Sequence, residues 1–521
     1  MDRRSFLKFG AGGVGAAAIA PFAAGCAPAA TPPTSLFSLG VAAGLHSASE
    51  VVLWTRADPT FDGSVSSLDW DVASDSGFGT IIDSGTVIVS AASDYTAKVL
   101  VGSLPADTSV WYRFRSGANT STVGRARTLP AAGASPTSLK LAYASCQAYA
   151  CGYYAAWRQI ATQPVDAVLF LGDYIYEAPN IQLLGRVRDE PTTIADNLTA
   201  YRERYRLYKS DADLQAAHAA HPFVIVYDDH EVANDWDSTW LTDFPQRVAD
   251  AYQAWFEYQP VWPIAGNQIY RSLAWGDLGE VFMLDTRQYR GAHRPGAPLI
   301  GTRDMTSFEA DPSRTILGAT QKSWLLGGLS AAQSAGRTWK IIGNQSMIAP
   351  IREVDADTPA AHAADPTLPL HAGTYSNTHF DSWEGFPVER DAVLSYLETN
   401  AIENTAFVTG DYHSFWQAPL TGDYDDAARP IVANEFAAGA ISSAGGAFNE
   451  NAIYGSYLST TPSFSYVDTH RNGYGLVECT PSEMKVTYYA HNAAYSTVLP
   501  SPAVQFTLAP GDPNATKTLL P

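Results

Sequence analysis

Residues 166–177 read DAVLFLGDYIYE: an apolar run, Val168 to Leu171, ends at a glycine and is followed by Asp173 and Tyr176. A short apolar run ended by glycine is typical of a buried strand in an α/β sheet. Sheets of this class bind ligands in the crevice beyond the carboxyl ends of their strands. The stretch therefore predicts an α/β core that carries a carboxylate and a phenol, three residues apart, at its functional edge.

The chain around this stretch, residues 139–521, alternates strand-like and helix-like runs, which is the pattern of the α/β class. We predict strands in LKLAYASC, AVLFLGD, FVIVYDD, EVFMLD, KIIGNQ and AFVTGDYH, and helices over 196–208, 246–258, 319–330 and 387–400. GYGLVECT and MKVTYYA, near the end, predict an antiparallel hairpin. Loops 291–316 and 349–386 are long and rich in Pro and Gly, so we expect them to shape a site.

The preceding residues, 36–130, have a different pattern. Short alternating runs (EVVLWTRA, LDWDVAS, GTVIVSA, YTAKVLVG and VWYRFRSG) are separated by turn residues at even spacing. This pattern predicts a small all-β sandwich of the immunoglobulin or fibronectin type III kind. LPAAGASPTS, 129–138, marks the boundary with the α/β domain. No group of metal-ligand residues lies at these strand ends, so we expect this domain to support the catalytic one.

Composition limits the classes of function. The chain has 521 residues, a net charge of −20 and four cysteines. The length predicts more than one domain, and so few cysteines exclude a disulfide scaffold. A protein this acidic is not expected to have a nucleic-acid-binding surface. Anionic substrates would need metal ions or a few arginines at the site itself.

The first residues, 1–35, are interpreted as a targeting signal and linker. Arg3-Arg4 precede SFLK, a short apolar segment and an Ala/Pro-rich region, which resembles a bacterial twin-arginine signal peptide. We therefore expect export by the twin-arginine machinery to the periplasm, the cell surface or the medium. Cys26 follows Ala-Ala-Gly, so it either carries a lipid anchor, the one membrane attachment expected, or is lost with the signal peptide.

Polar side chains follow each of the predicted α/β strands. Because parallel strands have their carboxyl ends together, we expect these residues to meet at one sheet edge. The side chains that follow the strands are Cys146, Asp173, Tyr176, Asp228, Asp229, His230, Asn234, Asp285, Arg287, Asn344, Gln345, Asp411 and His413.

Six of these residues are the candidate metal ligands. Asp173, Asn234 and Asp411 offer hard oxygens, His413 an imidazole, Cys146 a thiolate and Tyr176 a phenolate. A thiolate beside a phenolate favours an oxidised transition metal, which keeps both groups deprotonated. The asparagine and the aspartates suit calcium or a similar divalent ion. Two such ions side by side favour hydrolysis of a phosphate ester.

The motifs SCQ, LGDYIYE, DDHEVANDW, LDTRQYR, GNQ and TGDYHSFW, in this order, resemble those of the PhoD-like alkaline phosphatase family over roughly residues 36–490. The resemblance implies a calcineurin-like metallophosphoesterase core, a four-layer αββα sandwich. It implies hydrolysis of phosphate monoesters and diesters by a metal-bound hydroxide at an Fe(III) and Ca(II) centre. It also implies that Cys146, Asp173, Tyr176 and His413 bind the iron, and that Asp173, Asn234 and Asp411 bind the calcium.

The remaining candidate catalytic residues are Asp229, His230 and Arg287, and their roles stay open. His230 either contacts the phosphate or acts as an acid, or it only orients a metal ligand. Arg287 either binds phosphate or forms a structural ion pair. Cys151 is not part of the family pattern: it either competes for the metal, pairs with Cys146 or Cys479, or is a small buried side chain. A phospholipase-type phosphodiesterase and a calcium-dependent surface-binding protein are the alternative functions.

Overall fold

The computed structural model describes residues 35–61, 65–179, 186–296, 306–350, 380–424, 426, 428–444 and 464–521. The predicted twin-arginine signal and Cys26 lie in residues 1–34, outside the described part of the chain. Only the ends of the two long predicted loops, 291–316 and 349–386, belong to it.

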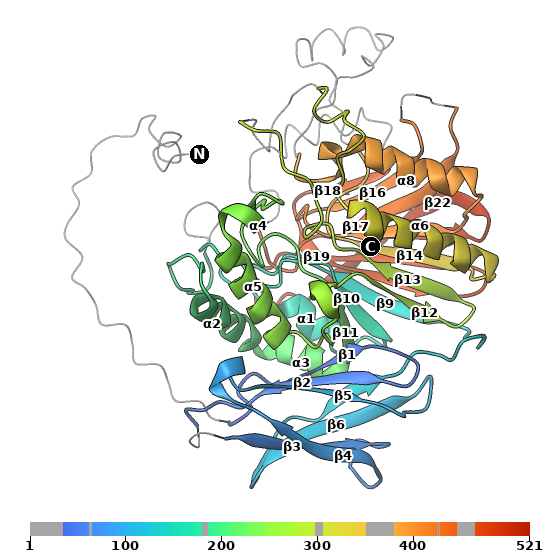
Figure 1. Ribbon diagram of the computed structural model, residues 1–521. Coiled ribbons are helices and arrows are strands. Elements are labelled where there is room, and N and C mark those ends of the chain that lie inside the picture. Colours follow the sequence, from blue (N-terminus) through green and yellow to red (C-terminus); the bar gives the residue numbers. More distant parts are fainter. Residues whose placement is uncertain are drawn as a thin grey trace.

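Within the described residues the strands form three sheets (Figure 1). The first has ten strands, in the order β22 (Asp512–Leu519), β21 (Ser501–Ala509), β20 (Met484–His491), β19 (Asn472–Cys479), β9 (Leu139–Ala144), β10 (Ala167–Phe170), β11 (Pro222–Ile225), β1 (Val41–Leu45), β2 (Val51–Arg56) and β5 (Thr96–Val101). The second has seven, in the order β12 (Arg271–Trp275), β13 (Gly279–Met283), β14 (Trp339–Asn344), β15 (Thr405–Thr409), β17 (Ile431–Ala437), β16 (Phe415–Thr421) and β18 (Tyr466–Asp468). The third consists of β4 (Ile81–Ile88), β3 (Ser67–Ala73), β6 (Ser109–Ser116) and β7 (Asn119–Thr120), with β8 (Gly124–Arg127) paired to β6.

The middle of each large sheet is parallel. β9, β10 and β11 pair in parallel in the first sheet, and β13, β14 and β15 do so in the second. All four residues of β10 are buried, which explains why its sequence shows no alternation of apolar and polar residues. The predicted α/β strands and the antiparallel β19–β20 hairpin are confirmed. The sequence analysis did not predict β21 and β22, which extend the first sheet beyond that hairpin.

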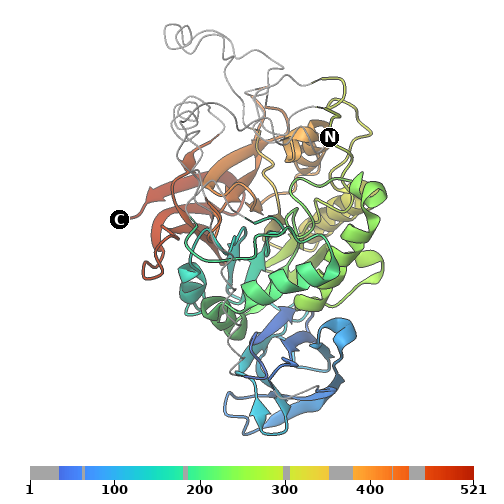
Figure 2. The same ribbon diagram turned by 90° about the vertical axis from the view of Figure 1, so that its left-hand side faces the viewer.

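Helices cover the outer faces of the two large sheets (Figures 1 and 2). The four predicted helices are confirmed as α2 (Leu198–Lys209), α5 (Pro245–Tyr258), α6 (Gly318–Ser334) and α8 (Pro387–Thr399). The short helices α1 (Ala155–Ile160), α3 (Ala212–Ala220) and α4 (Trp240–Asp243) were not predicted.

The core has two main parts. Buried side chains of α1, α2, α3 and α5 share one apolar cluster with both large sheets, while α6 and α8 pack on the other face of the second sheet. The inner faces of the sheets meet closely: a Cβ added to Gly343, on β14, would lie 3.3 Å from Leu171, at the end of β10. The carboxyl ends of strands from both sheets therefore lie near one another.

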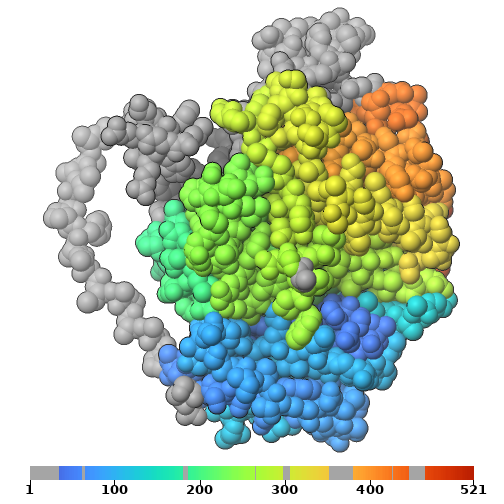
Figure 3. Space-filling view, in the orientation of Figure 1, coloured from blue at the N-terminus to red at the C-terminus, as the bar shows by residue number. Residues whose placement is uncertain are grey.

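The N-terminal all-β region is present, and it is joined to the α/β region through a sheet. β1 pairs in parallel with β11, at Gly44 and Phe223, so β1, β2 and β5 continue the ten-stranded sheet. Their other face packs on the five-stranded sheet, with Leu53 and Val101 opposite Val72 and Phe114 in one apolar cluster. Figure 3 shows this region, in blue, packed directly beneath the green part of the chain. Among the described residues, no helix has the length and apolar character needed to cross a membrane.

Candidate active site

The candidate site lies where strand ends of the two large sheets meet. Cys146 follows β9, Asp173 follows β10 and Asp229 follows β11, all in the ten-stranded sheet, whereas Asp411 and His413 follow β15 of the seven-stranded sheet. The sequence analysis placed these side chains at one sheet edge. That expectation is wrong in one respect, because two facing sheets contribute: alternation along the chain predicts parallel strands but does not say which sheet each strand joins.

Two Gly-Asp pairs let these strand ends approach each other. A Cβ on Gly172, whose φ is +111°, would lie 2.4 Å from the Cβ of Asp228. A Cβ on Gly410 would lie 2.8 Å from the side chain of Ser145. Glycine is the residue that permits so close an approach of two chain segments. The following residues, Asp173 and Asp411, are thereby brought into the same space.

Four of the six predicted metal ligands have a left-handed backbone conformation. The φ angles are +58° at Cys146, +58° at Asp173, +65° at Asp411 and +51° at His413. Residues other than glycine are uncommon in this region, where they cost of order 1–3 kcal/mol each, and they concentrate at functional sites. The backbone strain supports the view that these four side chains are held for a function.

The first group of side chains combines sulfur, nitrogen and oxygen donors. One ligand atom each of Cys146, Asp173 and His413 lies within 4.8 Å of the others. The hydroxyl of Tyr176 donates to Asp173 Oδ2 at 2.8 Å and lies 3.0 Å from His413 Nε2. The structure thus brings together all four residues that the resemblance assigns to iron.

The donors of this group are buried, and burial disfavours their charged forms. Burial and the neighbouring Asp173 carboxylate raise the pKa of the Cys146 thiol well above its ordinary value. Burial and the same carboxylate raise the pKa of the Tyr176 phenol. A multivalent cation between these donors would reverse both shifts, since it deprotonates a coordinating thiol outright. The donor set therefore fits a strongly Lewis-acidic metal ion.

The second group consists of oxygen donors. Asp228, Asp229 and Asp411 each place a carboxylate oxygen within 4.8 Å of the others, and Asp173 and Asp229 form a further group with His230. Oδ2 of Asp228 and Oδ1 of Asp229 are buried and have no hydrogen-bond partner among the described residues. Carboxylate oxygens that accept no hydrogen bond fit a hard divalent cation such as calcium.

Asn234, the remaining predicted ligand, lies at the rim of the site. Its side chain is exposed and donates through Nδ2 to Asp235 Oδ2 at 2.5 Å. Asp235 in turn places a carboxylate oxygen within 4.8 Å of Asp229 and Asp381. The carboxylates near the predicted calcium position thus include two residues, Asp235 and Asp381, that the sequence analysis did not assign.

His230 is held in a defined orientation. Its Nδ1 lies 2.7 Å from Glu177 Oε2, and its ring lies against that of Tyr176 with 4.1 Å between centroids. Burial lowers the pKa of His230, but the carboxylates of Asp229 and Glu177 raise it well above its ordinary value overall. Glu177, the last residue of the motif LGDYIYE, was not assigned as a functional residue, because nothing near it in the sequence indicates that it contacts His230.

Arg287 is fully buried among carboxylates. Its Nε donates to Asp228 Oδ1 at 2.5 Å, and its Nη2 lies 2.5 Å from Asp381 Oδ2 and 3.5 Å from Asp229 Oδ1. Asp381 also pairs with Arg290 and with His293. The guanidinium group therefore neutralises carboxylates beneath the site, as a structural ion pair would.

The described cysteines, Cys146, Cys151 and Cys479, are free thiols. Cys479 is buried on β19 and Cys151 is partly buried. The structure therefore contradicts a disulfide of Cys151 with either of the others and leaves Cys146 available as a ligand.

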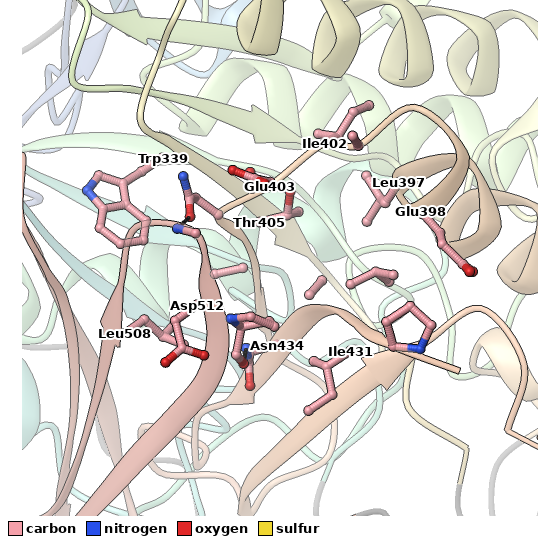
Figure 4. Close-up of a pocket in the computed structure, with 18 of the residues that line it drawn as sticks. Trp339, Leu397, Glu398, Ile402, Glu403, Thr405, Ile431, Asn434, Leu508 and Asp512 are labelled. Atoms are coloured by element: carbon pink, nitrogen blue, oxygen red, sulfur yellow. Dashed lines mark hydrogen bonds between the residues drawn. The ribbon is translucent and has the colours of Figure 1, made fainter. Parts of the chain in front are cut away.

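A pocket of about 210 Å³ lies away from these residues (Figure 4). It is lined by Trp339 and Thr405, at the amino ends of β14 and β15, and by Asn434, Leu508 and Asp512. Asp411 and His413 follow the carboxyl end of β15 in the same sheet, so the pocket lies at the opposite edge from the site.

Comparison with known proteins agrees with this geometry. Residues 141–488 match the model of the PhoD-like phosphatase family, and residues 23–130 match the model of the PhoD-like phosphatase N-terminal domain. Alkaline phosphatase D of Bacillus subtilis (strain 168) is 32% identical over 515 residues, which cover 94% of this chain and 84% of the relative.

Solved structures show the same relationship. A structure of PhoD superposes with a TM-score of 0.82 at 30% identity, covering 93% of this chain and 92% of that one. A purple acid phosphatase from yellow lupin (Lupinus luteus) seeds superposes with a TM-score of 0.54 at 11% identity, covering 90% of this chain and 73% of the other, which indicates a shared fold. The mixed α/β sheets with an N-terminal all-β region thus form a metallophosphoesterase-like fold. The chain belongs to the PhoD-like phosphatase family and is a phosphoric ester hydrolase.

Proposed function

We propose that this protein is an exported alkaline phosphatase that hydrolyses phosphate monoesters and diesters at a centre of one Fe(III) and at least one Ca(II). The observation that carries the proposal is the position of Asp173. This aspartate belongs both to the group with Cys146 and His413 and to the group with Asp229 and His230. A carboxylate shared by a sulfur- and nitrogen-containing group and an oxygen-rich group is the arrangement expected of a bridging ligand between two different metals.

In this proposal Cys146, Asp173, Tyr176 and His413 hold the iron, while Asp173, Asn234 and Asp411 hold the calcium. Oδ2 of Asp228 and Oδ1 of Asp229, which accept no hydrogen bond among the described residues, add negative charge on the calcium side. When bound, the two ions supply Lewis acidity to the phosphoryl oxygens and lower the pKa of a water molecule. We also propose that the two sheets and their helices are the four-layer αββα sandwich of the metallophosphoesterases.

Residues of the chain itself orient the groups around the substrate and supply the proton for the leaving group. The Glu177 carboxylate accepts a hydrogen bond, so Nδ1 of His230 carries its proton toward Glu177. The raised pKa of His230 favours the imidazolium form, which carries a second proton on Nε2. In the proposal Nε2 donates this proton to a phosphoryl oxygen or to the leaving alkoxide. Arg287 holds Asp228 in place, and its charge offsets part of the excess of carboxylates next to an anionic substrate.

A chelation experiment tests the metal assignment. A calcium-selective chelator is expected to lower the hydrolysis rate by about 100-fold or more, since the loss of one stabilising group from a phosphoryl-transfer site costs at least this much. Calcium added back should restore the rate, because mostly oxygen ligands release and rebind calcium readily. Iron, bound by a thiolate and a phenolate, should stay with the protein throughout. Activity that survives the treatment, or that returns with zinc and not with calcium, would contradict the assignment.

Export is proposed from the sequence of residues 1–34, which resembles a twin-arginine signal. Replacing Arg3 and Arg4 by lysine keeps the charge of the segment and removes the arginine pair. We expect the variant to accumulate in the cytoplasm, while the wild type is found outside the cytoplasmic membrane. Cell fractionation with an activity assay measures this, and unchanged export of the variant would overturn the proposed route.

A further inference from the structure

A short segment after β17 lies against the turn that carries Cys146. The backbone N–H of Ile441 donates to the carbonyl of Ser145 at 3.0 Å, and that of Ser443 donates to the carbonyl of Cys146 at 3.1 Å. Ser443 is 1% exposed. Its side chain is therefore fixed in the interior of the candidate site, and no role follows for it from the sequence motifs.

The Ser443 hydroxyl has two polar neighbours in the described residues. Its Oγ accepts a hydrogen bond from the backbone N–H of Ala148 at 2.9 Å. The same atom lies 2.7 Å from the hydroxyl oxygen of Tyr176. A serine hydroxyl has one proton to donate, and the Ala148 N–H needs none. The proton of Ser443 therefore points to the oxygen of Tyr176, whose own proton is donated to Asp173 at 2.8 Å.

We propose that Ser443 is a positioning residue for the metal centre: its hydroxyl donates a hydrogen bond to the Tyr176 oxygen when that oxygen is a metal-bound phenolate. The inference rests on the proposed function, since it requires an iron–phenolate bond. A metal ion would replace the proton that Tyr176 donates to Asp173, whereas the proton that Ser443 donates belongs to a different residue and would remain. A hydrogen bond to an ionised oxygen is shorter and stronger than one to a neutral oxygen. Ser443 would thus fix the direction in which Tyr176 faces the metal.

The hydrogen bond should also change the electronic properties of the iron–phenolate bond. A donor at the phenolate oxygen lowers the energy of its lone pairs, so more energy is needed to transfer an electron from the phenolate to Fe(III). Loss of the donor should move the visible absorption band to longer wavelength. Groups that orient metal ligands typically affect metal affinity by about 10–100-fold.

Ser442, the next residue toward the N-terminus, offers a matched control. It is also 1% exposed, and its hydroxyl donates to the carbonyl of Ala148 at 3.0 Å instead of to a metal ligand. Ser442→Ala and Ser443→Ala therefore remove the same group from equally buried neighbouring positions. A role limited to packing or folding predicts similar behaviour for the two variants, whereas the proposed role predicts a spectral change in one of them.

The experiment compares the visible spectrum and the iron retained under a strong chelator in the wild type, Ser442→Ala, Ser443→Ala and Ser443→Thr. We expect a shift to longer wavelength and about 10–100-fold weaker iron retention in Ser443→Ala, and neither change in Ser442→Ala or in the hydroxyl-bearing Ser443→Thr. If the alanine variant does not fold, Ser443→Val provides the same readout, because valine has the shape of threonine without its hydroxyl. A coloured wild type with an unchanged band and unchanged iron retention in Ser443→Ala would overturn this inference alone. A colourless, iron-free wild type would overturn the proposed function and the inference with it.

Discussion

Replacement of Asp173 by asparagine is expected to lower kcat/KM by more than about 100-fold and to release metal from both groups. Mutation of a residue that only orients a ligand costs about 10–100-fold. Asp173 belongs to the group with Cys146 and His413 and also to the group with Asp229 and His230. Asparagine keeps the shape of the side chain and tolerates the left-handed backbone that Asp173 adopts, with φ +58°. The variant therefore removes the negative charge with little change in folding. Metal analysis and steady-state kinetics on the purified variant measure both effects.

Asp107→Asn is the matched control for this substitution. Asp107 also has a left-handed backbone, with φ +53°, but its side chain is about half exposed and pairs with Arg127 in the N-terminal region. The control makes the same chemical change in the same backbone conformation. It should keep its metal and its activity, because Asp107 is not one of the candidate ligands. Asp173→Asn with full metal content and normal activity would show that Asp173 is not a bridging ligand.

Arg287→Met is expected to destabilise the fold by about 3–5 kcal/mol, the cost typical of removing one partner from a buried ion pair. The guanidinium is fully buried and lies 2.5 Å from both Asp228 and Asp381. Methionine would leave Asp228 in the interior without its counter-ion and would remove one of the cations beside Asp381, which keeps Arg290 and His293. Denaturant unfolding of the metal-free protein measures this effect without the stabilisation that a bound cation would add.

The control for Arg287 is an exposed ion pair. Arg158, whose side chain is 48% exposed, pairs with Asp213 at 2.7 Å, so Arg158→Met should cost less than about 1 kcal/mol. A similarly small cost for Arg287→Met would show that the buried carboxylates are neutralised in another way. Protonation is one such way, since burial raises the pKa of Asp228 to about 6 even with the guanidinium alongside.

The strands of the site could be predicted because their sequences are locally consistent. Each central strand is a short apolar run that ends at a polar residue, and the Gly-Asp pairs at 172–173 and 410–411 mark where the backbone turns. These local signals place Asp173 and Asp411 at strand ends without knowledge of their partners. The family resemblance supplied the combination of Cys146, Tyr176 and His413, which local signals alone leave open.

The remaining features depend on contacts between distant segments. Ser443 lies in the run ISSAGGA, which has no motif, and it reaches Tyr176 only because the segment after β17 pairs with the Cys146 turn. Asp381 lies in the predicted loop 349–386, and nothing local indicates that it pairs with Arg287. In the same way, the short, fully buried β1 was not predicted from the sequence, and nothing local reveals its pairing with β11, which joins the N-terminal region to the central sheet.

The most direct test of the account is the iron content and the visible spectrum of the protein purified without added metal or chelator, measured beside Tyr176→Phe. Phenylalanine keeps the ring and removes the oxygen that lies 2.8 Å from Asp173 and 3.0 Å from His413, so packing should change little. We predict a coloured, iron-containing wild type, because phenolate and thiolate donate charge to oxidised iron, whereas calcium and zinc permit no such transition. Tyr176→Phe should retain less iron, show a changed visible absorption because the phenolate contribution is gone, and hydrolyse phosphate esters more slowly. A colourless, iron-free wild type with full activity would contradict the account.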